Sequence, residues 1–332
     1  MSEEFHPVLW NSFISNLHHN QNNLKPTRIS SFVFLTLIWI GSLFGNHTSF
    51  AGAGNTWQDT GFSSSQQDAI ILVDKIKSLN TSAHWPHIKP DLFLANLKLT
   101  IYKPLSIYPG RMTNFCGYGA LTYLVLQEDP VQYVKFMLEL YNKGTAHFNS
   151  VFFEPSPSVR DAGGKLIYKG KLDIYPAEQM LFLTLADHFK GYLNILDHHY
   201  NPGDEDSFWA SVNFAKFNKM VKKMLNYKVQ AVGSDLFHPG VKDLYEYISK
   251  RLGTGSVVLY LNNRLLHKKN LVTLKLGIPT HFVVLQQIRK EENLITLVYW
   301  DYGGRTLLQL SPSFLKKIIF GISYFTKQSV HE

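Results

Sequence analysis

The chain has 332 residues, of which 45% are hydrophobic, 14% aromatic and 17% charged. This composition excludes a disordered or fibrous protein and is sufficient for a large buried core. The net charge of +8 comes from basic residues scattered through amphipathic segments and not from a basic tract, so we interpret it as a solvated surface and predict no nucleic-acid partner.

The N-terminal part resembles an export signal. An apolar run from Phe32 to Phe44 precedes the small residues Ala51-Gly52-Ala53. The run is short for a bilayer span, and small residues in this pattern are typical of a signal-peptidase cleavage site. We therefore predict a leader and signal peptide over 1–53, cleaved after Ala53, and a secreted or periplasmic mature chain over 54–332 without a membrane span. The long leader leaves open the alternative of an uncut N-terminal membrane anchor.

The first elements of the mature chain are predicted to be helical. Ser63–Leu79 begins with capping residues and repeats apolar side chains at helical spacing. The sequence from there to Pro109-Gly110 predicts mostly loops. A strongly apolar helix then begins at Cys116, and a second follows Asp129-Pro130 and ends at Gly144, with proline at its first position and glycine after its last.

Residues 141 to about 235 are predicted to form a mostly helical insertion, broken by NPGDED at 201–206. Within it, the glycine-containing stretch 160–173 alternates in character and predicts a small hairpin or an exposed loop. We expect the insertion to shape one side of a cleft.

The C-terminal third is predicted to hold a small antiparallel sheet. A helix over 241–253 precedes three β-rich runs at 255–263, 281–290 and 293–301. A tight connection joins the last two runs, so they should pair as an antiparallel hairpin. A last helix is predicted over Ser311 to Phe320.

Cys116 is the only cysteine of the chain, so it cannot form an intramolecular disulfide. In an exported protein such a thiol needs another explanation. The N–H groups and the dipole of a helix start stabilise a thiolate, which favours a nucleophile, and Gly117 and Gly119 would let a substrate backbone approach. The alternative is a buried cysteine that only fills apolar space.

A nucleophilic thiol needs a base and a group that orients this base. His281 opens one strand of the predicted hairpin and Asp301 ends the other, and a short turn brings these two ends together. Each residue can also have a purely structural role: His281 as a hydrogen-bonded histidine at a strand end, and Asp301 as an aspartate of a turn. The combination predicts a Cys116–His281–Asp301 triad.

Three segments resemble the papain-like cysteine peptidases, and among them the bacterial double-glycine leader peptidases. NFCGYGAL resembles the start of the nucleophile helix, HFVVL the histidine strand, and VYWDYGG the strand and turn that carry the orienting residue. The match covers 108–127 and 241–325. It implies a papain-like α+β fold, in which the nucleophile helix packs on a small antiparallel sheet, and it places nucleophile, base and orienting carboxylate on Cys116, His281 and Asp301.

One residue of the family pattern is missing. The family usually has a glutamine six residues before the cysteine as a donor to the oxyanion, and this chain has Gly110. Asn114 can replace it beside the backbone N–H of Cys116, or it can cap the helix, and both roles stay open. Trp300 is expected in the core or the cleft wall, and the alternative is that it shields the bond between His281 and the carboxylate from water.

Two other polar clusters do not predict a metal site. His198 and His199 are adjacent, so on a helix their side chains diverge by about 100°. The acidic run at 204–206 lacks the spacing of a calcium loop. We predict neither a metal nor an organic cofactor.

Together these features predict an exported cysteine peptidase that hydrolyses a peptide or other amide bond of a peptide or protein substrate through a thioester. A cognate inhibitor is an open partner. The alternatives are a peptidoglycan amidase, a deamidase or transamidase toxin on the same fold, and a papain-like binding module without turnover. Whether residues 54–107 are a pro-segment that blocks the cleft also stays open.

Overall fold

The computed structural model describes residues 64–110, 112–167, 174–190, 192, 199–263 and 281–327, which belong to a compact unit spanning Asn55–Glu332. The predicted leader and signal peptide lies outside the described residues. Helices and antiparallel strands occur together, so the fold class is α+β as predicted. Within the described ranges, no helix combines the length and apolar character that crossing a bilayer requires.

Most helices lie in the first two thirds of the chain. In order, the described helices are α2 Ser64–Asp74, α3 Pro90–Tyr102, η2 Pro104–Ser106, α4 Cys116–Glu128, α5 Pro130–Lys143, α6 Pro157–Ala162, α7 Pro176–Phe189, η3 Asp204–Asp206, α8 Phe214–Leu225, α9 Leu244–Leu252 and α11 Pro312–Ile318.

The strands form a small hairpin and a six-stranded antiparallel sheet. The hairpin pairs β1 Ala146–Phe148 with β2 Val151–Phe153. The sheet has the order β3-β8-β4-β5-β6-β7. Its strands are β3 Tyr227–Gly233, β4 Ser256–Leu261, β5 His281–Glu291, β6 Leu294–Asp301, β7 Gly304–Leu310 and β8 Ile319–Lys327.

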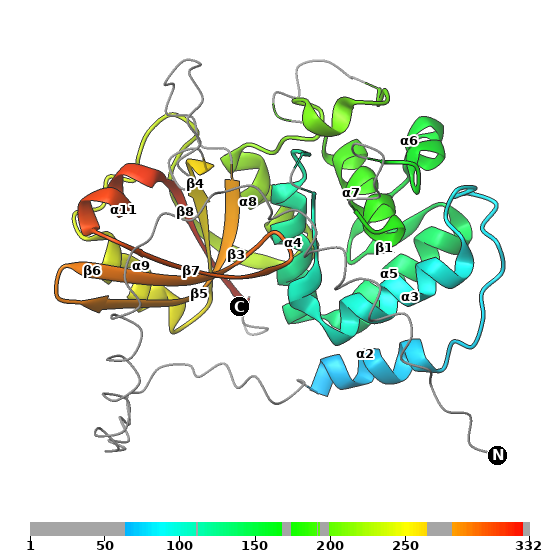
Figure 1. Cartoon of the computed structure of the whole chain (residues 1–332), viewed down its shortest axis with the longest axis horizontal. Helices are drawn as coiled ribbons and strands as arrows, with labels where there is room; N and C mark the ends of the chain where they lie inside the picture. The colour runs from blue at the N-terminus through cyan, green and yellow to red at the C-terminus, as the bar shows by residue number, and fades with distance from the viewer. Residues whose placement is uncertain are drawn as a thin grey trace, which may run out of the picture. The chain divides into compact units, whose positions relative to one another are not determined.

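The sheet is covered on both faces (Figure 1). Helices α4 and α8 pack on one face, and α4 also contacts α5 and α7, so the apolar face of the sheet and the helices share one core. Helices α9 and α11 cover the other face with a second apolar cluster. Helix α4 therefore lies between the sheet and the other helices, which explains why its side chains are apolar almost all round.

Helix α5 begins and ends at the residues that the sequence predicts. Asp129 caps α5 by accepting a hydrogen bond from the backbone N–H of Gln132, and Pro130 occupies the first turn. Gly144 ends the helix with a φ of +72°, a backbone conformation that glycine adopts without steric cost. The predicted helix, its first residues and its end at Gly144 are therefore all confirmed.

Several predicted elements are wrong. The stretch before Pro109, expected to be mostly loop, contains α3. The secondary structure of the insertion over 141 to about 235 is mostly helical where the structure describes it, as predicted, but the insertion also contributes β1, β2 and the edge strand β3. Arg160 of the expected hairpin or loop lies in α6, while 168–173 lie outside the described residues. The last helix stops at Ile318, and the chain continues as β8.

Part of the segment considered as a pro-segment belongs to the core. Phe93, Leu97 and Ile101 of α3 are fully buried, and α3 contacts α5 and α7. Ala69 and Val73 of α2 are also fully buried. Removing these helices would expose apolar side chains, so α2 and α3 are parts of the domain and not a detachable cover.

Candidate active site

Cys116 is the first residue of α4. Phe115 precedes it as the N-cap residue and gives no side-chain cap, so the start of α4 leaves its first N–H groups without the usual side-chain acceptor. Cys116 is buried, with 9% of the residue exposed, and it belongs to the main apolar core cluster.

The two glycines after Cys116 serve packing and not the approach of a substrate. A Cβ atom on Gly117 would come within 3.1 Å of Val212 and 3.3 Å of Phe282. A Cβ atom on Gly119 would come within 3.0 Å of Trp300. Both contacts lie between α4 and neighbouring segments, so the glycines let α4 approach the sheet closely.

His281 and Asp301 meet as the hairpin predicts. The Nε2 atom of His281 lies 2.6 Å from Oδ1 of Asp301, and the two residues are 1% and 7% exposed. Val284 pairs with Trp300, so the next residue of β6, Asp301, comes diagonal to His281 at the same end of the β5–β6 hairpin. A buried carboxylate thus fixes the orientation of the imidazole.

The surroundings of His281 favour its protonated form. Burial lowers the pKa of His281, but hydrogen bonding to Asp301 and to Cys116, together with the charges of both partners, outweighs burial and raises the pKa to about 9. The other ring nitrogen, Nδ1, is buried and makes no hydrogen bond of standard geometry with a described residue. We interpret Nδ1 as the atom that serves the thiol, at a geometry looser than that of a reacting complex.

Tyr302 is a site residue that the sequence did not indicate. Its ring stacks on the imidazole of His281, with centroids 4.6 Å apart and planes within 11°. Tyr302 and Gly303 form a two-residue turn between β6 and β7, and Tyr302 has a φ of +41°, which is rare for a residue with a side chain. Such a turn usually contains Asn-Gly or Asp-Gly. A tyrosine at the first of these positions was therefore the feature of the sequence that could have indicated a role for Tyr302 in the site.

Trp300 does not have the shielding role expected from its neighbour in sequence. Its ring stacks on Tyr123 of α4, with centroids 5.5 Å apart, and its Nε1 donates to the carbonyl of Leu105 at 3.2 Å. Alternation along β6 points Trp300 and Asp301 to opposite faces of the strand. Tyr302, and not Trp300, therefore covers the imidazole.

Three buried tyrosines lie near enough to Cys116 for its charge to act on their phenol groups. Burial raises the pKa of Tyr118, Tyr260 and Tyr302 above the usual range, and the negative charge of Cys116 adds to the increase in each case. These groups stay neutral at physiological pH. The sulfur therefore shares its surroundings with one ionisable partner of opposite charge, His281, and several neutral aromatic groups.

Asn114 has neither of the two roles considered for it. Its side-chain amide donates to the carbonyl oxygens of Asp206, at 2.6 Å, and of Ser207, at 3.0 Å. Its backbone N–H donates to the carbonyl of Glu205. It neither caps α4 nor keeps an amide hydrogen for a substrate oxygen, and it joins the segment before α4 to η3.

Helix α4 is joined to the sheet by a polar contact as well as by packing. The side-chain amide of Gln286 on β5 donates to the hydroxyl of Tyr123 at 2.8 Å. The Nε atom of Arg305 on β7 donates to the Gln286 carbonyl oxygen, also at 2.8 Å. Together with the Tyr123–Trp300 stack, this chain of contacts holds α4 against the strands that carry His281 and Asp301.

Asp187, an acidic residue near the histidines considered as metal ligands, has other partners. Asp187 accepts a hydrogen bond from the backbone N–H of Ser156 and pairs with Lys190. His198 lies outside the described residues. Among the described residues, no group of three or more histidine, cysteine or acidic side chains could hold a metal ion.

A buried carboxyl group supports the segment that leads to Cys116. Glu178 of α7 is 1% exposed and accepts hydrogen bonds from the backbone N–H of Tyr108, at 3.2 Å, and from the hydroxyl of Thr100, at 3.5 Å. Burial raises the pKa of Glu178 from 4.5 to about 8, because too few donors compensate the loss of water. At neutral pH the group is held mainly as the neutral acid.

We expect this carboxyl to make the domain less stable at higher pH. The folded state keeps the proton of Glu178 up to about pH 8, whereas the unfolded state releases it near pH 4.5, so the free energy of unfolding falls between these values. The slope is up to about 1.4 kcal/mol per pH unit. Glu178→Gln should remove this slope in urea unfolding at pH 5, 6.5 and 8, while the exposed Glu291→Gln should keep it. Equal pH dependence in wild type and Glu178→Gln would contradict the expectation.

Comparison of the chain with models of known protein families, with curated proteins and with solved structures found no match. The assignment of a function therefore rests on the residues and their geometry.

Proposed function

We propose that this chain is an exported cysteine peptidase of papain-like architecture, which hydrolyses an amide bond with Cys116, His281 and Asp301. The observation that carries the proposal is the buried imidazole of His281, whose Nε2 bonds Asp301 at 2.6 Å while the Cys116 side chain acts on the same ring. Structural histidines rarely combine a buried carboxylate partner with a thiol at a helix start.

The proposed reaction has two halves. In the first, the proton of Cys116 resides on His281, the sulfur attacks the carbonyl carbon, and the tetrahedral intermediate expels the amine, which takes the proton from His281. In the second, His281 removes a proton from water, the resulting hydroxide attacks the thioester, and the sulfur leaves as thiolate. Asp301 keeps the ring orientation and stabilises the imidazolium in both halves.

The oxyanion needs donors other than the side chain of Asn114. We assign this role to backbone N–H groups of the first turn of α4, because these groups have no acceptor within the helix and the dipole adds positive potential there. A site that relies on backbone donors alone would keep the attack geometry but would give a slower reaction than one with an added side-chain donor.

Exposed apolar side chains beside the site support a polypeptide substrate. Leu236 and Phe237 are 73% and 74% exposed, at the tip of the loop that follows β3. The loop is held in place by Asp235, whose Oδ1 accepts hydrogen bonds from the backbone N–H of Phe214 and from the hydroxyl of Tyr260, both at 3.1 Å. A fixed loop that presents two apolar side chains to solvent is suited to binding an apolar partner.

The register of the sheet gives the separation of this loop from the catalytic base. Gly233, Gly321, Tyr260 and Phe282 pair in one row across β3, β8, β4 and β5, and His281 is next to Phe282. Three strand spacings amount to about 14 Å, which about four residues of an extended peptide span. We therefore propose that Leu236 and Phe237 contact apolar side chains about four residues from the scissile bond.

The test of the proposal is the alkylation of Cys116 by iodoacetamide, followed by the mass of the intact protein. Because the chain has one cysteine, each added group reports on this site alone. An ordinary thiol reacts in proportion to its thiolate fraction, which is half near pH 8.5. We expect fast labelling already at pH 6 in the wild type and labelling slower by at least about tenfold in His281→Ala.

The two rates should converge above about pH 10, where even a thiol without a partner is ionised. The exposed His147→Ala serves as the matched control and should label like wild type. Equal rates for wild type and His281→Ala at pH 6 would overturn the triad and favour a binding module without turnover. A peptide library beside purified peptidoglycan then separates a peptidase from an amidase, and released ammonia indicates a deamidase.

A further inference from the structure

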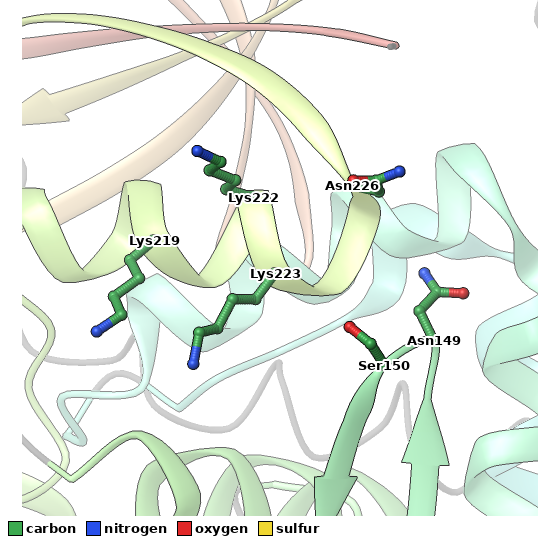
Figure 2. A pocket seen from close by; sticks show the side chains of 6 residues that line it. All are labelled: Asn149, Ser150, Lys219, Lys222, Lys223 and Asn226. Atoms are coloured by element: carbon green, nitrogen blue, oxygen red, sulfur yellow. The ribbon is translucent and has the colours of Figure 1, made fainter. Parts of the chain in front are cut away.

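A second site lies away from the catalytic residues, between α8 and the turn that joins β1 to β2 (Figure 2). It is an open cavity of about 700 Å³, and the residues that line it are all exposed: Asn149, Ser150, Lys219, Lys222, Lys223 and Asn226. Three of these six residues are lysines, and none is acidic. The volume is in the range of pockets that hold small organic ligands.

The two walls of the cavity are fixed to each other. The side-chain amide of Asn149, at the tip of the β1–β2 turn, donates to the carbonyl of Met224 in the last turn of α8. Asn149 and the C-cap residue Asn226 have φ values of +50° and +53°, which asparagine tolerates better than most residues. The cavity therefore exists before a ligand arrives.

No carboxylate among the described residues pairs with the lysines that line this cavity. Lys219 and Lys223 are four residues apart and extend on the same side of α8 (Figure 2), where two like charges disfavour the helix. A bound anion would relieve this repulsion.

Two neighbouring groups respond to these charges. Burial, and then the charge of Lys219, lower the pKa of Lys216 to about 8. Burial also lowers the pKa of His188, and the charges of Lys223 and Lys190 add to this effect, while Asp187 opposes it. The positive potential therefore extends beyond the lining residues.

We propose that this cavity binds a phosphorylated polyol, in which lysines hold the phosphate and the Asn and Ser side chains contact hydroxyl groups. Lysine is a common phosphate ligand that acts as a point charge. No arginine lines the cavity, so bidentate recognition of a carboxylate is absent from its lining, and no aromatic ring is there to stack on a nucleobase. A cavity larger than one phosphate leaves room for the polyol.

The experiment is isothermal titration of the purified chain with inorganic phosphate, glycerol 3-phosphate and a short poly(glycerol phosphate). We expect saturable binding in which glycerol 3-phosphate binds more tightly than inorganic phosphate. Lys219→Gln/Lys222→Gln/Lys223→Gln should weaken binding by at least about tenfold. If the polymer binds more tightly per phosphate than the monomer, the natural ligand is a polymer, and equal binding indicates a free polyol phosphate.

The matched control is Lys242→Gln/Lys316→Gln/Lys317→Gln, which removes three exposed lysines elsewhere and changes the net charge equally. It should bind like wild type. Equal weakening in both triple variants would overturn the proposal, because the charge of the whole protein would then explain binding. Absence of saturable binding by all three phosphates would also overturn it. Far-UV circular dichroism should be the same in all three proteins.

Discussion

Replacing Cys116 with alanine is expected to reduce kcat/KM for amide hydrolysis by at least about 10⁴-fold, because no other group in the site can form the thioester. Hydrolysis is measured as new amino termini released from a denatured protein, beside amine release from peptidoglycan. Hydroxylamine added to the wild type should intercept the thioester and give a hydroxamate, and Cys116→Ala should give none.

The control for Cys116→Ala is its stability. The thiol is 9% exposed at a helix start, and alanine is a good helix residue, so the free energy of unfolding should change by less than about 1 kcal/mol. A folded Cys116→Ala protein that still hydrolyses within tenfold of wild type would contradict the assignment of the nucleophile. Loss of hydrolysis in this folded variant, together with hydroxamate formation by wild type, would support it.

Asp301→Asn is expected to lower kcat/KM by about 10²–10⁴-fold, a range typical for the loss of an oriented acid or base. The carboxylate is one of the groups that raise the pKa of His281 to about 9, and burial opposes them. With a neutral amide at position 301, a group that raises the pKa of His281 is lost, whereas burial still lowers this pKa. The pKa of His281 therefore falls. The ring then no longer holds the proton of the thiol at neutral pH.

The pH dependence of stability checks the same point. The pKa of His281 is raised on folding from about 6.5 to about 9, so its interactions stabilise the folded state fully below pH 6.5 and are lost as the pH rises through about 9. In Asp301→Asn the decrease of the free energy of unfolding across this window should become smaller. Asp74→Asn, an exposed carboxylate change, is the matched control. An unchanged pH profile in Asp301→Asn would contradict the proposed coupling.

The parts of the fold that the sequence predicts well are those with local signals. The start and stop of α5 follow from Asp129, Pro130 and Gly144, and the β5–β6 hairpin follows from two β-rich runs with a short connection. Because His281 and Asp301 sit at defined ends of that hairpin, their contact could be predicted as well. Each of these inferences depends on residues close together in the chain.

The elements that the sequence does not predict depend on distant partners. Strand β8 is a short apolar run, and such a run cannot be told from the end of a helix by periodicity alone. It becomes a strand because it fills the place between β3 and β4. Likewise, Tyr302 and Asn114 owe their roles to contacts that only the folded chain provides, with His281 and with the carbonyl of Asp206.

The close packing of α4 on the sheet bears on how the proposed enzyme could be regulated. Gly119 against Trp300, the Tyr123–Trp300 stack and the amide of Gln286 leave little room for α4 and the sheet to separate. In the proposed enzyme, Cys116 and His281 would therefore stay close together in the folded chain. We therefore expect an inactive form to arise when another molecule, or another stretch of this polypeptide, blocks access to the site. We do not expect it to arise from a hinge motion that moves the sulfur away from the imidazole.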